Sequence, residues 1–265
     1  MKFAVVVPWV NEAQIEEFLG KWGVVSSAVP EWLVLMHDHN KRGCAVTKNA
    51  GIEAALTRGA EVVVLLDDDC FPHGEVRTLE ALALAHIEAL APQEVALYRA
   101  VTKPPSRGTP YGKLTVEMPV AASMGFWTGV GDYCAVRQLA FGGDAPMEFD
   151  RSAVFAQYFP LCAMNLAFKP REWMPWCRLI DSPRNDDIWM GWLWQREAYR
   201  RGHCFNLAGP LVRHSRQSDP MRNLEVEVRH LRSNETLWAR IAAHPSGDYD
   251  ELLTLLPADE GGSDR

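Results

Sequence analysis

The sequence predicts an α/β fold, with a doubly wound, mostly parallel sheet and a smaller subdomain. Three observations predict it: strand-like runs of Val and Leu, amphipathic helical segments between them, and a change of organisation after residue 100. The apolar run at 62–66 reads as a strand buried on both faces, which is typical of parallel sheets. We therefore expect one domain over residues 1–242, in two halves (1–100 and 101–242), followed by a flexible acidic tail at 243–265.

In the first half, strands and helices alternate, as a sheet with crossover helices requires. Asn11 is suited to cap the first helix, and Gly59 follows the second as a C-terminal cap. The expected strands are 3–7, 32–36, 62–66 and 94–99, and the expected helices follow Asn11 and cover 47–58 and 75–90.

The second half has less regular signals. Residues 103–113 contain three prolines and two glycines and predict a long exposed loop, whereas 121–136 and 141–147 carry turn residues and resist assignment. Two acids at the start of 186–201 and a proline at the start of 220–241 favour helices there. The expected strands are 161–168 and 203–207, with a helix beginning near residue 171.

Composition narrows the class of protein. A net charge of -7 argues against a general nucleic-acid binder, although it leaves a local basic groove open. No apolar stretch approaches membrane-spanning length, and the N-terminus lacks a secretory cleavage pattern. Six scattered cysteines without a CxxC pair argue against disulfides and structural zinc. We expect a cytoplasmic protein without a membrane span.

The run Asp67-Asp68-Asp69-Cys70 at the end of the buried strand is the most informative motif. Three adjacent carboxylates repel one another, and a divalent cation removes that conflict. Magnesium and manganese take carboxylate oxygens and usually complete their shell with substrate phosphates. Ligands of open α/β sheets bind at the carboxyl ends of strands. The motif therefore favours a metal–phosphate site over the alternative, a solvated acidic turn.

A second acidic pair, Asp186-Asp187, lies beside Trp189 and Trp192. Capping by Asn185 or Asp186 explains one acid. The other is suited to act as general base or to hold a substrate hydroxyl. Both interpretations stay open, and Trp127, Trp189 and Trp192 are candidate walls for a sugar or an acceptor.

Several polar residues elsewhere are weaker candidates. His214 is a third metal ligand if it faces the aspartates, with Arg213 or Arg216 neutralising a diphosphate; the alternative is a basic surface turn. Asn165 stands in an apolar run, where core hydrogen bonding is the default and ligand contact the alternative. Lys48 is within reach of a diphosphate unless it belongs to a solvated helix face. His37 and His39 lack a third ligand for zinc, which leaves Asp38 as a nucleoside contact.

The ordered set of motifs resembles a known family. A first strand that ends in Pro8 with Asn11-Glu12 nearby, and an Asp-x-Asp motif at a strand end, resemble a GT-A glycosyltransferase. The stretches 67–71, 164–172, 186–192 and 209–215 are similar, in the same order, to signatures of the plant reversibly glycosylated polypeptides, the UDP-arabinopyranose mutase family. The similarity is good from about residue 61 to 230.

The resemblance implies a GT-A-like fold, manganese or magnesium as cofactor, and a UDP-sugar as ligand. The first half would bind the nucleotide, and the second half would complete the metal site and face the acceptor. Metal ligands would be Asp67, Asp69 and His214, and Asp186 and Asp187 would lie near the sugar as the catalytic pair. Contacts to the nucleotide sugar would come from Pro8, Asn11, Asp38, Lys48, Asp67, Asp68, Asn165, Trp189, Arg213 and Arg216.

One departure from the family concerns its self-glycosylated arginine. The segment that carries it is shorter here, and Arg151 is the only arginine between residues 141 and 160. The sequence therefore predicts a metal-dependent glycosyltransferase that moves a sugar to an external acceptor, whether glycan, small molecule, protein or modified base. The alternatives are a UDP-sugar mutase, a binding subunit without activity, and a transferase acting on modified DNA bases. Homo-oligomerisation stays open.

Overall fold

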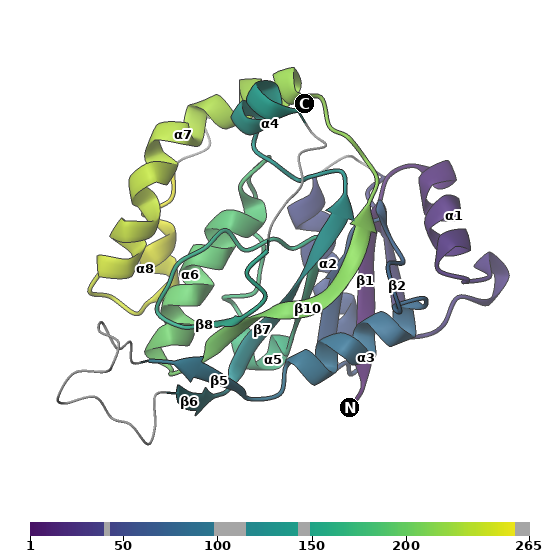
Figure 1. Ribbon diagram of the computed structural model, residues 1–265, viewed down its shortest axis with the longest axis horizontal. Helices are drawn as coiled ribbons and strands as arrows, with labels where there is room; N and C mark the ends of the chain where they lie inside the picture. The colour runs from purple at the N-terminus through teal and green to yellow at the C-terminus, as the bar shows by residue number, and fades with distance from the viewer. Residues whose placement is uncertain (40–42, 98–114, 143–148, 258–265) are drawn as a thin grey trace, which may run out of the picture.

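The computed structural model describes residues 1–39, 43–97, 115–142 and 149–257. An eight-stranded sheet forms the centre, in the order β2-β1-β3-β9-β7-β10-β4, with β8 paired to β10 (Figure 1). Strands β1, β2, β3, β7 and β10 run in one direction, and β4, β8 and β9 run against them. The strands are β1 (Phe3–Trp9), β2 (Leu33–His37), β3 (Val62–Leu66), β4 (Cys70–Phe71), β7 (Val120–Gly129), β8 (Ala153–Val154), β9 (Asn165–Phe168) and β10 (Cys204–His214).

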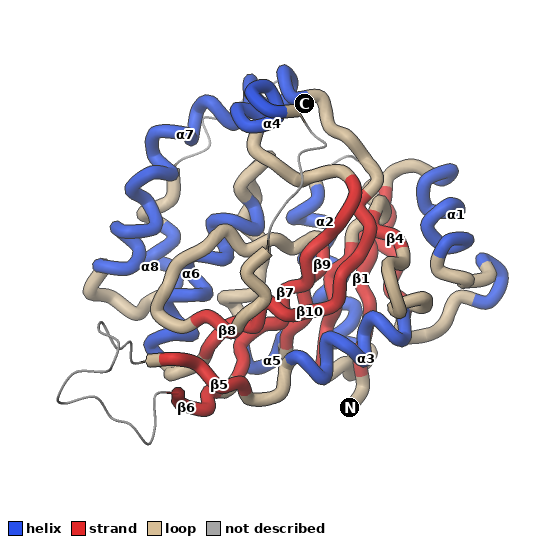
Figure 2. The backbone as a smooth tube through the Cα atoms, viewed as in Figure 1, coloured by secondary structure: helices blue, strands red, loops and turns tan. Residues whose placement is uncertain are grey.

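Helices cover both faces of this sheet. Figure 2 shows α3 on the near face, with α2, α5 and α6 on the far face. A two-stranded sheet, β5 (Gln93–Ala96) with β6 (Thr115–Met118), lies apart from the main one. The helices are α1 (Glu12–Lys21), η1 (Ser26–Ala28), α2 (Cys44–Thr57), α3 (Leu79–Ala89), α4 (Ala135–Phe141), α5 (Pro170–Trp173), α6 (Asp186–Arg200), α7 (Pro220–Ala243) and α8 (Tyr249–Leu253). The predicted α/β, GT-A-like fold is confirmed.

Strand β3 positions the acidic motif. All five of its residues are buried, because β1 covers one edge and β9 the other, with Val5 opposite Val64 and Leu66 opposite Asn165. Burying Val and Leu from both faces removes a large apolar area from water, at about 25 cal/mol per Å². Asp67 follows at the carboxyl end of this strand, where the backbone leaves the sheet.

Strand β10 is longer than the predicted strand at 203–207. Its register against β7 shifts on both sides of Gly209, so that Pro210 is accommodated at an irregularity in the ladder. The pair Gly209-Pro210, which would usually end a strand, therefore lies within β10, and the strand continues to His214. At the same level in β7, a Cβ on Gly125 would lie 2.2 Å from Asn165 Nδ2, so that only glycine fits there.

Part of the expected tail is also ordered. Helix α8 buries Leu252, and the ring of Tyr249 lies 5.0 Å from that of Trp176. The acidic composition of this segment predicts a flexible tail, and it does not indicate that Leu252 and Tyr249 pack against the rest of the protein. The predicted loop at 103–113 and most of the turn-rich segment at 141–147 lie outside the described residues. Within the described ranges, no helix is long and apolar enough to cross a membrane.

Candidate functional site

The first side of the site is an ion pair between α2 and the end of β3. Lys48 is buried on α2, and its Nζ lies 2.6 Å from Asp67 Oδ1 and donates to the carbonyl of Ala163 at 3.0 Å. Burial would lower the pKa of Lys48, but the carboxylate of Asp67 raises it well above the usual value. Lys48 is therefore a fixed cation and not part of a solvated helix face.

The second side joins Asp69 to the end of β10. Arg216 Nε lies 2.9 Å from Asp69 Oδ2, and His214 Nε2 lies 3.5 Å from the same oxygen. His214 Nδ1 hydrogen-bonds to the carbonyl of Val130 at 2.8 Å, which orients the ring and leaves Nε2 toward Asp69. Burial would raise the pKa of Asp69, but His214 and Arg216 lower it overall. The structure thus brings Asp69 and His214 together, as the sequence predicts.

Asp68 lies between Gln14 of α1 and Arg216. Its Oδ1 accepts from Gln14 Nε2 at 3.0 Å and lies 4.0 Å from Arg216 Nη1. Burial and the charge of Asp69 raise the pKa of Asp68 to about 7. Asp68 is thus placed to hold a proton near neutral pH.

The backbone of Ala163 connects the acidic pair Asp186-Asp187, at the start of α6, to the ion pair between Lys48 and Asp67. Asp187 Oδ2 accepts from the N–H of Ala163 at 2.8 Å, while the carbonyl of Ala163 accepts from Lys48. Ala163 therefore connects the pair to Asp67. Asn185 makes no side-chain capping bond; its Oδ1 accepts from Asn234. The pair Asp186-Asp187 is thus not accounted for by capping alone.

Burial raises the pKa of both acids in this pair. That of Asp186 reaches about 7, because burial and then the neighbouring charge of Asp187 both disfavour its carboxylate. Both acids therefore hold a proton more readily than a free carboxyl group does. We call the five residues Asp67, Asp68, Asp69, Asp186 and Asp187 the acidic cluster.

Asp132 is a residue that the sequence reasoning missed. It follows β7, and its Oδ2 lies 3.9 Å from Cys162 Sγ, in the segment before β9. Asp132 is exposed at the surface, yet the protein atoms around its carboxyl group remove water from it and, with the charge of Asp187, raise its pKa to about 6. The available signal was an acid directly after the glycine-rich stretch at 125–131, at the carboxyl end of a strand.

The predicted nucleotide contacts at the first two strands have local partners. Asn11 Oδ1 accepts from the N–H of Ala13 at 2.9 Å and caps α1. Asp38 is buried, and its Oδ2 accepts from the N–H of Gly43 at the start of α2. Pro8 is buried in β1 opposite Met36. All of these lie toward the carboxyl ends of β1 and β2, the same edge as the acidic cluster.

Three predicted contacts lie outside the cluster. Asn165 is buried, with Oδ1 2.8 Å from His86 Nε2 and Nδ2 donating to the carbonyl of Pro210 at 2.8 Å. The ring of Trp189 is buried, and its Nε1 donates to Asn234 of α7. Arg213 is exposed and alternates with His214 along β10. The geometry favours the core interpretation of Asn165 and also places Trp189 in the core, because its ring faces α7.

A metal centre formed by protein ligands alone is not seen. Among the described residues, no group of three or more His, Cys, Asp or Glu side chains is arranged to hold a metal ion. Asp69 and His214 supply two adjacent ligands, whereas Asp67 is held by Lys48. The donor set fits magnesium or manganese only if a diphosphate and water supply the other oxygens.

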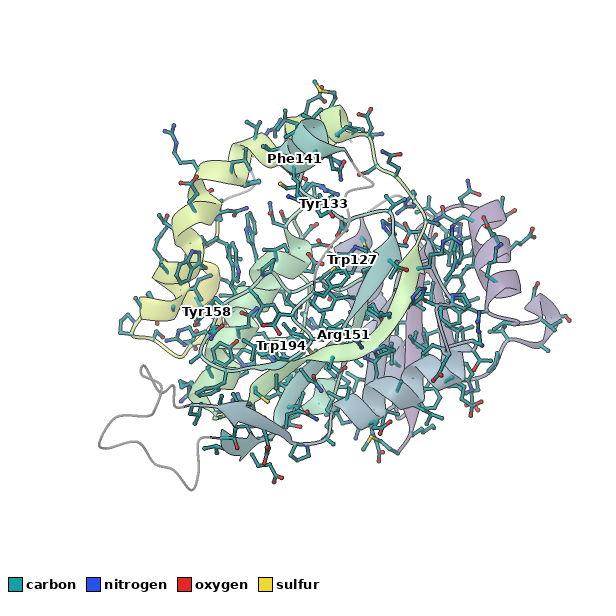
Figure 3. The ribbon with its side chains drawn as sticks, viewed as in Figure 1. Trp127, Tyr133, Phe141, Arg151, Tyr158 and Trp194 are labelled. Atoms are coloured by element: carbon teal, nitrogen blue, oxygen red, sulfur yellow. The ribbon has the colours of Figure 1, made fainter. Side chains whose placement is uncertain are left out.

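Arg151 lies away from the acidic cluster. Its Nη2 donates to the carbonyls of Ala208 and Gly209 at 3.3 and 3.0 Å, beside β10 (Figure 3). It lines a surface groove of about 610 Å³ with residues of the β4–α3 connection and of α3, among them His73, Glu75 and Glu88. None of the five acids lines this groove.

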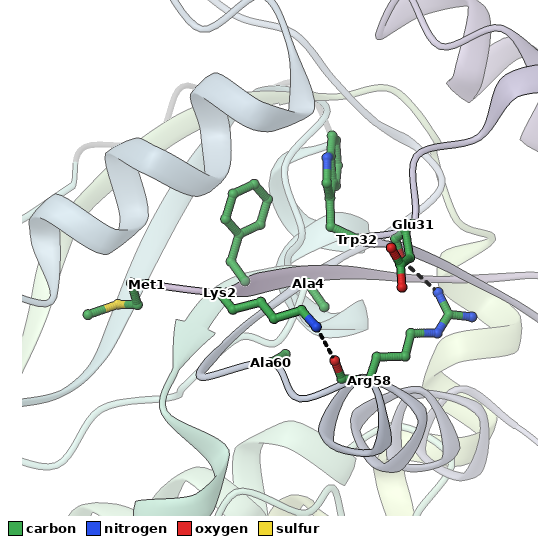
Figure 4. A pocket seen from close by; sticks show the side chains of 8 residues that line it. Met1, Lys2, Ala4, Glu31, Trp32, Arg58 and Ala60 are labelled. Atoms are coloured by element: carbon green, nitrogen blue, oxygen red, sulfur yellow. Dashed lines mark hydrogen bonds between the residues drawn. The ribbon is translucent and has the colours of Figure 1, made fainter.

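A second pocket lies at the opposite edge of the sheet. It measures about 270 Å³ and is lined by Phe3, Ala4, Trp32 and Ala60 near the amino ends of β1 and β2 (Figure 4). Lys2 Nζ closes one side by donating to the carbonyl of Arg58 at 2.6 Å. Since the acidic cluster lies at the carboxyl ends, this pocket is separate from it.

Comparison with known proteins agrees with the motifs. The chain is 30% identical over 190 residues to probable UDP-arabinopyranose mutase 1 of Pisum sativum, covering 64% of this chain and 51% of that protein. UDP-arabinopyranose mutase 3 of Arabidopsis thaliana is 31% identical over 191 residues, covering 62% of this chain and 50% of that protein. UDP-arabinopyranose mutase 1 of the same plant is 29% identical over 194 residues, covering 64% and 52%.

The chain spans about half the length of these curated relatives. No protein-family model matches it. The names of these relatives describe UDP-arabinopyranose mutases. The ordered motifs, the fold and these matches show that the chain is similar to UDP-arabinopyranose mutases over about two thirds of its length.

Proposed function

We propose that the chain binds a UDP-sugar at the acidic cluster and interconverts two ring forms of the sugar, as a UDP-sugar mutase. The observation that carries the proposal is the convergence of Lys48, Arg216 and His214 with two acidic motifs at one edge of the sheet. The plant relatives named as UDP-arabinopyranose mutases supply the candidate substrate, a UDP-pentose.

A mutase must break the bond between the anomeric carbon and the diphosphate and form it again after the ring closes through another hydroxyl. The diphosphate gains negative charge as this bond breaks. Arg216 and His214 are placed to stabilise that charge once a ligand displaces their contacts with Asp69. Lys48 stays paired with Asp67 and keeps the end of β3 in place.

The acidic pair is suited to the sugar side of this reaction. When the ring opens, the former ring oxygen gains a proton and becomes a hydroxyl, and the hydroxyl that closes the new ring loses its proton. Asp186, whose pKa is raised to about 7, can hold such a proton, and Asp187 is fixed by the N–H of Ala163. Asp132, whose pKa is raised to about 6, is a further proton carrier near the same pair.

A divalent cation is compatible with this proposal. In that case Asp69 and His214 would hold the cation, the diphosphate and water would supply the remaining oxygens, and Arg216 alone would face the diphosphate directly. When bound, the cation would add positive charge beside the leaving diphosphate. The bond from His214 Nδ1 to the carbonyl of Val130 is the kind of contact that orients a metal-binding histidine.

Transfer to an external acceptor is the second candidate, and Arg151 favours it. Arg151 is the only arginine in the segment where the family carries its glycosylated residue, and its guanidinium is bound to backbone carbonyls of β10. A protonated guanidinium in this place is a poor nucleophile. A chain without a glycosylated arginine would have to pass the sugar elsewhere or return it directly to UDP.

The test is incubation of the protein with UDP-arabinopyranose and manganese, with the nucleotide sugars separated by chromatography. The mutase proposal expects a new UDP-pentose isomer, and no isomer from the matched variant Asp186→Asn/Asp187→Asn. Free pentose, or a pentose on an added acceptor, without any isomer would favour the transferase. Intact mass spectrometry reports a covalent adduct, which Arg151→Lys should remove only if Arg151 carries it.

Binding of the UDP-sugar without isomerisation, hydrolysis or transfer would indicate the non-catalytic alternative. Salt-dependent binding to DNA would support the modified-base alternative. Unchanged stability of the protein in the presence of every UDP-, GDP- and TDP-sugar would contradict a nucleotide-sugar site altogether, since a ligand that binds the folded state must stabilise it.

A further inference from the structure

Helix α7 packs against both α4 and α6, and its inward face is polar where it meets them (Figure 1). Glu227 is buried although it carries a charge, and His230 is buried with its ring 5.0 Å from that of Trp189. Asn234, a further turn along the helix, is half-buried. A helix that only covers a core buries apolar residues. Buried polar groups at these positions therefore require specific partners.

Asn234 joins two residues that enclose the acidic pair along the chain. Its Oδ1 accepts from Trp189 Nε1 at 2.9 Å, and its Nδ2 donates to Asn185 Oδ1 at 3.1 Å. Asn185 directly precedes Asp186, and Trp189 is two residues after Asp187. Asn185 makes no side-chain capping bond of its own to the helix. The single amide of Asn234 therefore holds the first turn of α6 on both sides of the acidic pair.

Glu227 holds two further segments near the same acids. Its Oε1 accepts from Nε and Nη2 of Arg184 at 3.0 and 2.8 Å, and its Oε2 accepts from the N–H of Ala135 at 2.8 Å. Arg184 is two residues before Asp186. Ala135 begins α4, three residues after Asp132. One carboxylate thus connects the approach to α6 with the segment that carries Asp132.

Asp132 and Asp187 meet at neighbouring residues of one loop. Asp187 Oδ2 accepts from the N–H of Ala163, and Asp132 Oδ2 lies 3.9 Å from Cys162 Sγ. Loss of water around the carboxyl group and then the charge of Asp187 raise the pKa of Asp132, whereas the guanidinium of Arg184 lowers it. The two acids therefore interact over a distance that depends on how α6 and the end of β7 are held.

We propose that Glu227 and Asn234 of α7 are positioning residues for the sugar side of the reaction. They set the place of the pair Asp186-Asp187 relative to Asp132, so that protons pass to and from the sugar at fixed distances. Both act through the segments that they hold and not by touching the sugar. A misplacement of about 1 Å costs on the order of 10²-fold in rate. This inference rests on the proposed function, because it assigns the two residues through the chemistry of the acidic cluster.

The first test compares kcat and KM for isomerisation of the UDP-sugar in Asn234→Ala and in the wild-type protein. We expect kcat to fall at least ~10-fold, with KM changed by less than about twofold, because the diphosphate side of the site is untouched. The matched control is Asn223→Ala, which removes an amide from the same helix that donates to Ser218, and which should keep the wild-type kcat. Thermal unfolding verifies that both variants are folded.

The second test asks whether each positioning residue acts through the acids. In the background Asp187→Asn, the further change Asn234→Ala should lower kcat by clearly less than it does in the wild-type protein, since part of what it positions is already gone. A general structural effect would instead multiply with the loss from Asp187→Asn. The same cycle with Glu227→Gln and Asp132→Asn tests the second contact of α7.

The third measurement does not depend on turnover. Hydrogen exchange detected by mass spectrometry should speed up over residues 183–192 in Asn234→Ala, whereas Asn223→Ala should leave these residues as in the wild-type protein. If the wild-type protein does not isomerise the UDP-sugar, the proposed function fails, and hydrogen exchange still decides whether α7 holds the acidic pair.

Two results would overturn the inference. One is unchanged hydrogen exchange at the start of α6 in Asn234→Ala, whatever the reaction. The other arises in a protein that does turn over a UDP-sugar: a loss in Asn234→Ala that falls on KM alone, or that multiplies fully with the loss from Asp187→Asn, would make Asn234 a structural residue without a positioning role.

Discussion

Two polar groups of residues lie next to each other in this fold, and they differ in kind. Leu66 pairs with Asn165 across β3 and β9, and Asp67 follows Leu66 directly. Asn165 belongs to a fully buried network with His86 and Ser123, in which His86 bonds to Asn165 at 2.8 Å and to Ser123 at 2.9 Å. Asp67 belongs to the acidic cluster at the edge of the sheet.

The difference lies in what satisfies each group. The network is neutral, and its hydrogen bonds are made inside the protein, including that from Asn165 to the carbonyl of Pro210. The acidic cluster holds five carboxylates against Lys48, Arg216 and His214, and burial raises the pKa of Asp68 and Asp186 to about 7. A satisfied buried network stabilises a fold, whereas unbalanced charge at a strand end indicates a binding site.

The largest effect should come from Asn165→Leu. It leaves a buried ring nitrogen of His86 and the carbonyl of Pro210 without a partner, which should lower the free energy of unfolding by about 4 kcal/mol. Urea unfolding measures this cost, and UDP affinity of the folded protein should stay the same. Lost UDP affinity at unchanged stability would instead make Asn165 a ligand contact. Ser123→Ala is the milder control, since it removes one bond of the network.

The next effect concerns acid stability. Burial lowers the pKa of His86 from 6.5 to about 4, so that between these values the unfolded chain binds more protons than the folded one. The contribution of His86 to stability should therefore rise with pH across this window, by on the order of 3 kcal/mol. The raised pKa values of Asp68, Asp132 and Asp186 act in the opposite direction over the same window, so the contribution of His86 is read as the difference between the wild-type protein and a His86 variant. Urea unfolding at pH 4.5 and 7 measures the difference. His86→Gln should lose stability at pH 7 relative to pH 4.5 when compared with the wild-type protein, and an equal slope in both proteins would exclude a contribution from His86.

This comparison also shows what the sequence could predict. The alternation of apolar runs and helical segments was enough for the α/β fold, because β1 and β3 are buried along their length and their residues show it directly. β10 was predicted too short, because Gly209 and Pro210 usually end a strand and here lie at an irregularity within it. Local patterns do not report such tertiary pairing.

In the candidate site, too, some contacts could be predicted from the sequence and others could not. Asp69 and His214 were expected to meet because the Asp-x-Asp motif calls for a further metal ligand and the ordered motifs resemble a family with such a site. Whether Lys48 is a site residue depends on which side of α2 faces β3. Whether the ring of Trp189 lies in the core depends on where α7 packs. Those are facts about packing between distant segments, so residue types alone left both interpretations open.

Asp187→Asn should change the free energy of unfolding less than the substitutions above, but it should lower the rate of UDP-sugar turnover strongly. The amide oxygen can still accept from the N–H of Ala163, so that stability should change little. Turnover of the UDP-sugar should fall about 10²-fold, equivalent to about 2.7 kcal/mol, if the carboxylate positions or deprotonates the sugar. Rate measurement alongside thermal unfolding separates the two. The control Asp150→Asn changes an exposed acid outside the cluster and should be neutral, and wild-type turnover in Asp187→Asn would leave that carboxylate without a catalytic role.

The smallest effect should be that of metal on nucleotide affinity. Asp69 already pairs with Arg216 at 2.9 Å, so a cation must displace that contact before it gains its own. We therefore expect manganese to tighten UDP binding by only about tenfold over binding with a chelator, equivalent to about 1.4 kcal/mol. Isothermal titration calorimetry with and without chelator measures the ratio.

Asp69→Asn distinguishes a metal ligand from a simple ion-pair partner. The amide removes the charge that a divalent cation needs, and it also releases Arg216. If Asp69 holds the metal, the variant should bind UDP equally well with manganese and with chelator, because the released Arg216 can still reach the diphosphate. The control Asp150→Asn should keep the wild-type ratio. Equal affinity in the wild-type protein under both conditions would mean that Arg216 and His214 neutralise the diphosphate without a metal.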